Sequence, residues 1–241
     1  MVDCGLLNLG TCLPQKIFEF IVNIINAPIQ PFLQLTLNLL SEPINLNLFF
    51  TMWVIVIYCL SMFYALLLLG SGFNFMISGY DSAKREKAKT WLRNVLIMIV
   101  LVQASFFIYE LAIDLSASVT SATLTLINQN FFLIGVNGIS DLGMAILFGF
   151  LYLITLIFTS LILVLRYAFV AIGVVLFPIG IFLYFMPALK QYGSLLLNFL
   201  GTAIFVTIFD AILLAGFSQL VNLSIFGSMQ VLVLISAFAC I

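Results

Sequence analysis

Residues 79 to 94 read GYDSAKREKAKTWLRN and lie between two long apolar runs. This stretch, the basic turn, holds five of the chain's eight Lys and Arg residues: Lys84, Arg85, Lys87, Lys89 and Arg93. Its net charge is +3, and that of all other residues is −4. Lys and Arg in short loops stay on the cytoplasmic side of a membrane. The basic turn therefore predicts a membrane hairpin with a cytoplasmic turn, which membrane lipid anchors by about 1 kcal/mol per basic residue where the leaflet is anionic.

The composition also indicates a membrane protein. Hydrophobic residues make up 64% of the 241 residues and charged residues 7%, against about a quarter charged in soluble domains. The mean hydropathy is +1.30. A helix needs roughly 20 apolar residues to cross a bilayer core of about 30 Å, and lipid offers no partner to open backbone groups. Several runs reach that length and lack the alternation of barrel strands. We therefore expect an all-α polytopic transmembrane bundle.

The N-terminal part, residues 1–43, is expected to be an external segment with one amphipathic helix over 14–41, kinked by Pro28 and Pro31. Polar residues recur there every three or four positions on one narrow stripe. Such a helix lies in the membrane interface, or its uncharged stripe faces a water-filled lumen. Cys4 and Cys12 form a local disulfide if this end faces an oxidising exterior, or they stay free thiols.

The remainder, residues 44–241, is expected to form the transmembrane domain with at least five spans. The first two are Leu48–Leu69 and Val95–Ile113, on either side of the basic turn. Because the turn is cytoplasmic, the first span runs inward and the N-terminus is external.

Residues 142–186 hold a single charge, Arg166, and leave two interpretations open. They form two spans with a hidden turn, or one long helix followed by a short re-entrant piece. The expected helix breaks are at Pro178 and Pro187. Another long helix is expected after them, and the last 17 residues barely suffice to span.

Polar side chains inside these runs are candidates for function, because charges are costly in lipid and face protein or water. Arg166 either pairs with Asp210, or each lies at a helix end and reaches lipid headgroups. Four further positions belong to polar stripes along predicted helices: Gln103, Glu110, Asn198 and Thr202.

No constellation of catalytic residues is recognisable in the sequence. Histidine is absent, which removes the usual neutral-pH acid and base and the commonest metal ligand. The sequence contains no nucleophile motif, zinc motif or phosphate-binding loop. We therefore expect a protein that is not an enzyme and needs no metal or cofactor.

The sequence of the basic turn, SGYDSAKREKAKTWLRN, follows a Gly-rich helix end and resembles the basic hairpin of type IV secretion (conjugation) membrane proteins. Beyond it, Arg166, Pro178, Pro187 and Lys190 follow a pattern similar to the polytopic TrbL-type inner-membrane subunits of these systems. The chain is also similar to CedA-like membrane proteins of archaeal DNA exchange, and an archaeal source would suit it. The resemblance covers roughly residues 48–222.

The resemblance implies a non-enzymatic channel or assembly-platform subunit in the cytoplasmic membrane. It would oligomerise with its own copies around the path of DNA or pilin subunits, and a conjugation-type ATPase would dock from the cytoplasm. The basic turn would contact that ATPase or single-stranded DNA, and no small-molecule substrate is expected. The alternative is a small-solute transporter, a class marked by paired broken helices. The sequence contains a single Pro-broken stretch, around Pro178, which disfavours that alternative.

Overall fold

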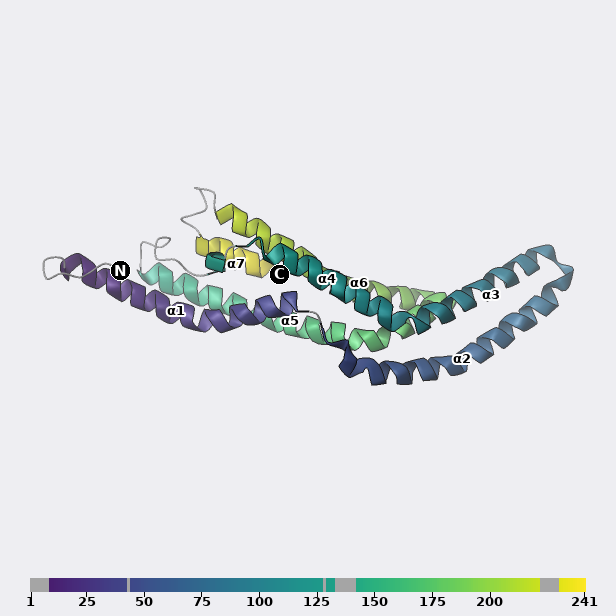
Figure 1. Cartoon of the computed structure of the whole chain (residues 1–241). Helices are drawn as coiled ribbons and strands as arrows, with labels where there is room; N and C mark the ends of the chain where they lie inside the picture. Colours follow the sequence, from purple (N-terminus) through teal and green to yellow (C-terminus); the bar gives the residue numbers. More distant parts are fainter. Residues whose placement is uncertain (1–8, 43, 128, 133–141, 222–229) are drawn as a thin grey trace. The chain divides into compact units, whose positions relative to one another are not determined.

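A computed structural model describes residues 9–42, 44–127, 129–132, 142–221 and 230–241 (Figure 1). Within these ranges it contains helices and no strand, which confirms the predicted all-α fold. Seven α-helices and three short 3-10 helices are described: α1 (Leu9–Ser41), η1 (Leu46–Phe49), α2 (Phe50–Ile77), η2 (Ser78–Tyr80), α3 (Ser82–Gln103), α4 (Ser105–Leu124), η3 (Gln129–Phe132), α5 (Leu142–Phe185), α6 (Lys190–Val221) and α7 (Gln230–Cys240).

Three segments among the described residues are long and apolar enough to cross a membrane: Leu46–Ile77, Ile146–Phe185 and Lys190–Val221. Helices α3 and α4 make a fourth if the pair counts as one span, although it bends by 60°. These helices support the predicted membrane protein. Helix α7 is apolar but shorter, and the predicted total of at least five crossings stays a prediction.

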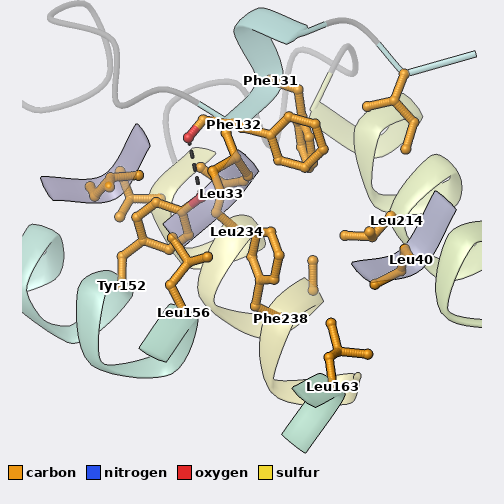
Figure 2. Packing of buried hydrophobic residues seen from close by; sticks show 14 residues of the cluster. Leu33, Leu40, Phe131, Phe132, Tyr152, Leu156, Leu163, Leu214, Leu234 and Phe238 are labelled. Atoms are coloured by element: carbon orange, nitrogen blue, oxygen red, sulfur yellow. Dashed lines mark hydrogen bonds between the residues drawn. The ribbon is translucent and has the colours of Figure 1, made fainter. Parts of the chain in front are cut away.

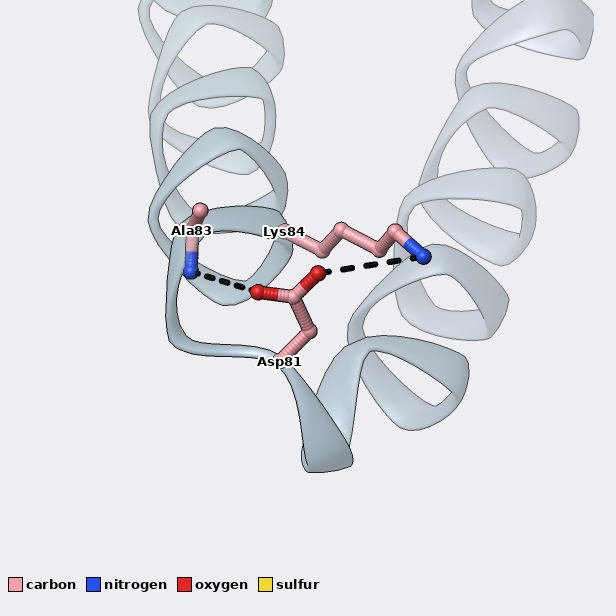
Figure 3. Close-up of polar contacts among 3 residues, drawn as sticks. All are labelled: Asp81, Ala83 and Lys84. Carbon is pink, nitrogen blue, oxygen red and sulfur yellow. Dashed lines mark hydrogen bonds and ion pairs between the residues drawn. The ribbon is translucent and has the colours of Figure 1, made fainter.

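The turn of the first helical hairpin, between α2 and α3, agrees with the prediction from the sequence. Helix α3 begins inside the basic turn, as predicted, because the Asp81 side chain accepts a hydrogen bond of 3.0 Å from the Ala83 backbone N–H (Figure 3). An acidic N-cap suits the positive end of the helix dipole. Helix α2 continues to Ile77, past the predicted end at Leu69. The glycines after Leu69 therefore do not end the helix.

The prediction of a helix break at Pro178 is wrong, because α5 runs through it to Phe185. Proline removes one N–H donor and crowds the preceding turn, but membrane helices tolerate it where neighbours pack around it. Pro178 is buried, as are Ile181 and Phe182 after it. Arg166 thus lies in one helix of 44 residues, without a hidden turn or a re-entrant piece. The break predicted at Pro187 is confirmed, since it lies between α5 and α6.

The chain divides into two compact units, which are described separately. Unit 1 comprises Met1–Glu42, Ala117–Leu165 and Thr207–Ile241. Its apolar core draws on α1, α5, α6 and α7 (Figure 2), with labelled members Leu33, Leu40, Phe131, Phe132, Tyr152, Leu156, Leu163, Leu214, Leu234 and Phe238. Hydrogen bonds also join helices within it. Thr36 Oγ1 lies 2.9 Å from Ser160 Oγ, the Thr159 hydroxyl donates to the Phe238 carbonyl over 2.9 Å, and the Tyr152 hydroxyl donates to the Phe132 carbonyl over 3.2 Å.

Unit 2 comprises Pro43–Ser116 and Arg166–Val206, and its core also explains a bend that the sequence analysis did not predict. The expected second span breaks after Gln103, where α3 ends and α4 begins at an angle of 60°. At that point Trp53 Nε1 donates to Ser105 Oγ over 2.9 Å, in a buried contact. Phe106 packs edge-on against Phe50, with ring centroids 5.2 Å apart. Contacts with α2 therefore accompany the bend, and neither proline nor glycine lies there.

Candidate functional site

The basic turn forms the first three turns of α3, and all five of its cations are exposed. The one ion pair among them joins Lys84 Nζ and Asp81 Oδ2 over 3.8 Å, with side chains 74% and 47% exposed (Figure 3). A pair so exposed contributes little to stability. The cations are therefore available to groups outside the chain.

Helical geometry divides the basic turn into two faces, because successive residues are rotated by about 100°. Lys84, Lys87 and Trp91 lie within one sector, the lysine face. Arg85, Lys89 and Arg93 lie within another, the arginine face, about 165° away.

Each face borders a groove against the end of α2. The groove on the lysine face has a volume of about 460 Å³ and is lined by Asn74, Ile77, Ser78, Lys84, Lys87, Ala88 and Trp91. The groove on the arginine face measures about 830 Å³ and is lined by Phe75, Gly79, Ser82, Arg85, Glu86, Lys89 and Leu92. The structure thus separates cations that the sequence presents as one cluster.

Arg166 forms a second polar site, inside the apolar part of unit 2. Its Nε donates to the Ala203 carbonyl over 2.7 Å, and a terminal nitrogen donates to the Ile204 carbonyl over 3.1 Å. Ser116 Oγ donates to the same Ile204 carbonyl over 2.8 Å. A carbonyl oxygen has two lone pairs, so the Ala203 carbonyl can accept from Arg166 in addition to a helix bond, and the Ile204 carbonyl accepts from both Arg166 and Ser116. Arg166 therefore fixes α5 to α6, and Ser116 adds α4.

These carbonyl partners were not predicted, because a backbone acceptor leaves no mark in a sequence. The predicted partner Asp210 is buried and belongs to unit 1, whereas Arg166 belongs to unit 2. Their pairing stays a prediction.

A tight packing layer lies one turn along α5 from Arg166. Tyr109 is 1% exposed, and its hydroxyl donates to the Val170 carbonyl over 2.7 Å. A Cβ placed on Gly173 would collide with the Tyr109 hydroxyl and lie 2.7 Å from Leu200 Cδ2. Only glycine fits this position without a shift of its neighbours, so Gly173 allows α4, α5 and α6 to approach closely.

Helix α6 carries a polar face at its beginning, about 120° wide on the helical projection. Its members are Lys190, Gln191, Ser194, Asn198 and Thr202. Asn198 and Thr202 are exposed, and the Thr202 hydroxyl donates to the Asn198 carbonyl over 2.8 Å. A groove of about 640 Å³ runs along this face, lined by Pro187, Lys190, Gln191, Ser194, Leu195 and Asn198.

The remaining predicted positions that the structure describes line none of the grooves above. Gln103 is exposed at the end of α3, and Glu110 is half-buried in α4. Cys4 and the side chain of Cys12 lie outside the described residues, so their disulfide stays a prediction. Within the part of the chain that the structure describes, no three His, Cys, Asp or Glu side chains are grouped to hold a metal ion.

Comparisons with known proteins found no relative of this chain. No family model, curated protein or solved structure matches the chain. Its function is therefore argued from the sites themselves.

Proposed function

We propose that the protein is a non-enzymatic channel or assembly-platform subunit of a type IV secretion-like machine in the cytoplasmic membrane. It assembles with copies of itself and passes DNA or pilin subunits in conjugation or DNA exchange. Two features support this proposal: the polar face of α6 supports an assembly, and the arginine face of the basic turn supports a cytoplasmic partner.

The polar face of α6 is the observation that carries the proposal. Lys190–Val221 is apolar enough to span a membrane, yet Asn198 and Thr202 are exposed on it. A side-chain amide in hydrocarbon lacks hydrogen-bond partners, which costs several kcal/mol. Asn, Ser and Thr are typical of surfaces where membrane helices contact each other. We therefore assign this face to a second copy or to a water-filled lumen that the copies enclose.

The charge pattern supports an orientation with the basic turn in the cytoplasm and the N-terminus outside. If α3 and α4 return the chain to the outside, the single helix α5 crosses inward and Lys190 reaches the cytoplasmic side. Six of the eight cations then lie inside, as expected from the positive-inside tendency.

The arginine face then serves as the docking surface for a conjugation-type ATPase or single-stranded DNA. Guanidinium groups bind carboxylates and phosphates through paired hydrogen bonds. Arg85 and Lys89 border a groove of about 830 Å³, and Arg93 extends the same face by one turn.

Assembly is tested by placing a photo-cross-linking amino acid at Asn198 in the membrane-embedded protein. We expect covalent dimers and higher oligomers of the chain. The control position is Leu66, which is 64% exposed on α2 and should capture lipid. If Asn198 captures lipid alone and the purified protein is a monomer that transports a small solute in liposomes, the proposal is wrong and the transporter alternative holds.

Transfer is tested in cells that lack the gene and are complemented with variants. The double variant Arg85→Gln/Lys89→Gln should reduce DNA transfer at least tenfold at an unchanged membrane level. Lys84→Gln/Lys87→Gln, which removes the same charge from the lysine face, is the matched control and should retain transfer. Unimpaired transfer by cells that lack the gene would contradict the proposed function.

A further inference from the structure

We propose that the groove on the lysine face binds the phosphate headgroup of an anionic phospholipid. The inference goes beyond the proposed function and does not depend on it. It rests on the chemistry of the groove, on the apolar side chains at the hairpin tip and on the position of Trp91.

The groove offers hydrogen-bond donors to an anion. Lys84 and Lys87 lie one turn apart and both line it, and each ammonium group has three donors. Lys84 reaches from α3 towards α2 in Figure 3. Asn74 adds an amide. The Ser78 hydroxyl donates to the Phe75 carbonyl over 2.9 Å, so its oxygen stays an acceptor for a headgroup hydroxyl or ammonium.

The other part of the groove is apolar. Ile77, Ala88 and Trp91 line it. Trp91 is half-buried and lies one turn before Val95, the first buried apolar residue of the second predicted span. Tryptophan gathers where hydrocarbon meets the headgroup layer. Lys84 and Lys87 lie about 10 and 6 Å further along the helix axis, and their flexible stems reach back to the headgroups. An anion above an apolar floor matches a phospholipid.

The tip of the hairpin favours lipid over nucleic acid. Phe73, Met76 and Ile77 are 63%, 78% and 78% exposed, and they lie on the last turns of α2 beside the basic turn. A polynucleotide backbone would leave these side chains in water. Apolar side chains next to lysines are typical of segments that lie in the headgroup and acyl boundary. The size of the groove, about 460 Å³, falls in the range of small-ligand sites.

The two faces of the basic turn would then have different ligands. The lysine face binds a lipid headgroup. The arginine face points about 165° away and remains open to a cytoplasmic partner.

The test uses the fluorescence of Trp91 in the full-length, detergent-solubilised protein, titrated with brominated phosphatidylglycerol or brominated phosphatidylcholine. The signal of Trp91 is the difference between the wild type and Trp91→Phe, because Trp53 is 8% exposed and common to both. We expect half-maximal quenching at a phosphatidylglycerol concentration about tenfold below that for phosphatidylcholine, since each basic residue near an anionic surface contributes severalfold to binding.

Matched double variants give the decisive comparison. Lys84→Gln/Lys87→Gln should lose the preference for phosphatidylglycerol, and Arg85→Gln/Lys89→Gln should keep it within twofold. Both change the net charge by the same amount. Equal quenching by the two lipids in the wild type, or equal loss in the two variants, overturns the proposal.

Competition distinguishes the sources of phosphate. Millimolar inorganic phosphate and single-stranded DNA should each leave the quenching unchanged. Displacement by either overturns the assignment to lipid. Failure here leaves the cell-based transfer assay unaffected, because that assay depends on the arginine face.

Discussion

Two helical hairpins of unit 2 differ in how their helices meet. Where α5 is followed by α6, a Cβ placed on Gly193 would lie 2.6 Å from the Cα of Tyr184 and 2.7 Å from the carbonyl carbon of Leu183, so backbone touches backbone. Where α2 is followed by α3, a Cβ placed on Gly70 would lie 3.9 Å from the Trp91 ring, an ordinary contact with a side chain, and one on Gly72 would meet nothing within 4 Å. Grooves lie on both sides of the turn.

The difference indicates a structural role for the α5–α6 hairpin and a role in recognition for the α2–α3 hairpin. The α5–α6 hairpin satisfies its cation internally, since Arg166 donates to carbonyls of α6. The α2–α3 hairpin directs its five cations outward. Substitutions in the first should therefore change stability, and substitutions in the second should change binding.

The largest effect is expected for Gly193→Ala. The added methyl group collides with backbone rather than with a movable side chain, so the helices must separate. We expect destabilisation by about 3 kcal/mol or more, measured by unfolding in mixed micelles with increasing dodecyl sulfate. Wild-type stability of Gly193→Ala would show that the two helices do not approach this closely.

Arg166→Met should follow in size. It keeps the apolar stem and removes the charged hydrogen bonds to the Ala203 and Ile204 carbonyls, and such bonds contribute about 1.5 to 3 kcal/mol each before the relief of desolvation. We expect a net loss of about 2 kcal/mol in the same unfolding assay. Arg166→Lys should recover part of it, because one ammonium donor can reach a carbonyl. Equal stability of Arg166→Met and wild type would show that the hydrogen bonds of Arg166 do not stabilise the fold.

Asp81→Ala tests the beginning of α3. Loss of the N-cap hydrogen bond to Ala83 should cost about 1 kcal/mol, and the exposed contact with Lys84 should add little. Asp81→Asn is the control, since asparagine caps as well as aspartate. Amide hydrogen exchange of the first turn of α3 should rise in Asp81→Ala alone. If Asp81→Asn frays the turn equally, the charge matters rather than the cap.

Gly72→Ala should have the smallest effect and the opposite sign. Its position in α2 is open, and alanine favours a helix by about 0.5 to 1 kcal/mol over glycine. A small gain in thermal stability is expected. A loss comparable with that of Gly193→Ala would contradict the contrast between the hairpins.

The sequence predicts the turn of the first hairpin well, because the signals that mark it are local. An aspartate before a helical stretch marks the start of α3, and net charge marks the turn. Proline at 187 marks the end of α5, since it lies where the chain reverses. These features depend on residues near each other in the chain.

The sequence does not predict the features that depend on contacts between residues far apart in the chain. The bend after Gln103 coincides with a bond from Trp53 to Ser105, across 52 positions. Pro178 ends no helix, because the surrounding packing tolerates it. The carbonyl partners of Arg166 could not be predicted, since every residue has a carbonyl. The division of the basic turn into two grooves likewise depends on where α2 lies beside α3.

The net charge of +3 on the basic turn has a consequence for biogenesis. Carrying five Lys and Arg side chains to the bilayer centre costs roughly 12 to 17 kcal/mol, so the hairpin cannot invert once inserted. A membrane potential of 100 mV, negative inside, opposes the outward movement of three net charges by about a further 7 kcal/mol. With the basic turn in the cytoplasm, as proposed, the orientation of the first two helices is set once, during insertion, and an energised membrane reinforces it.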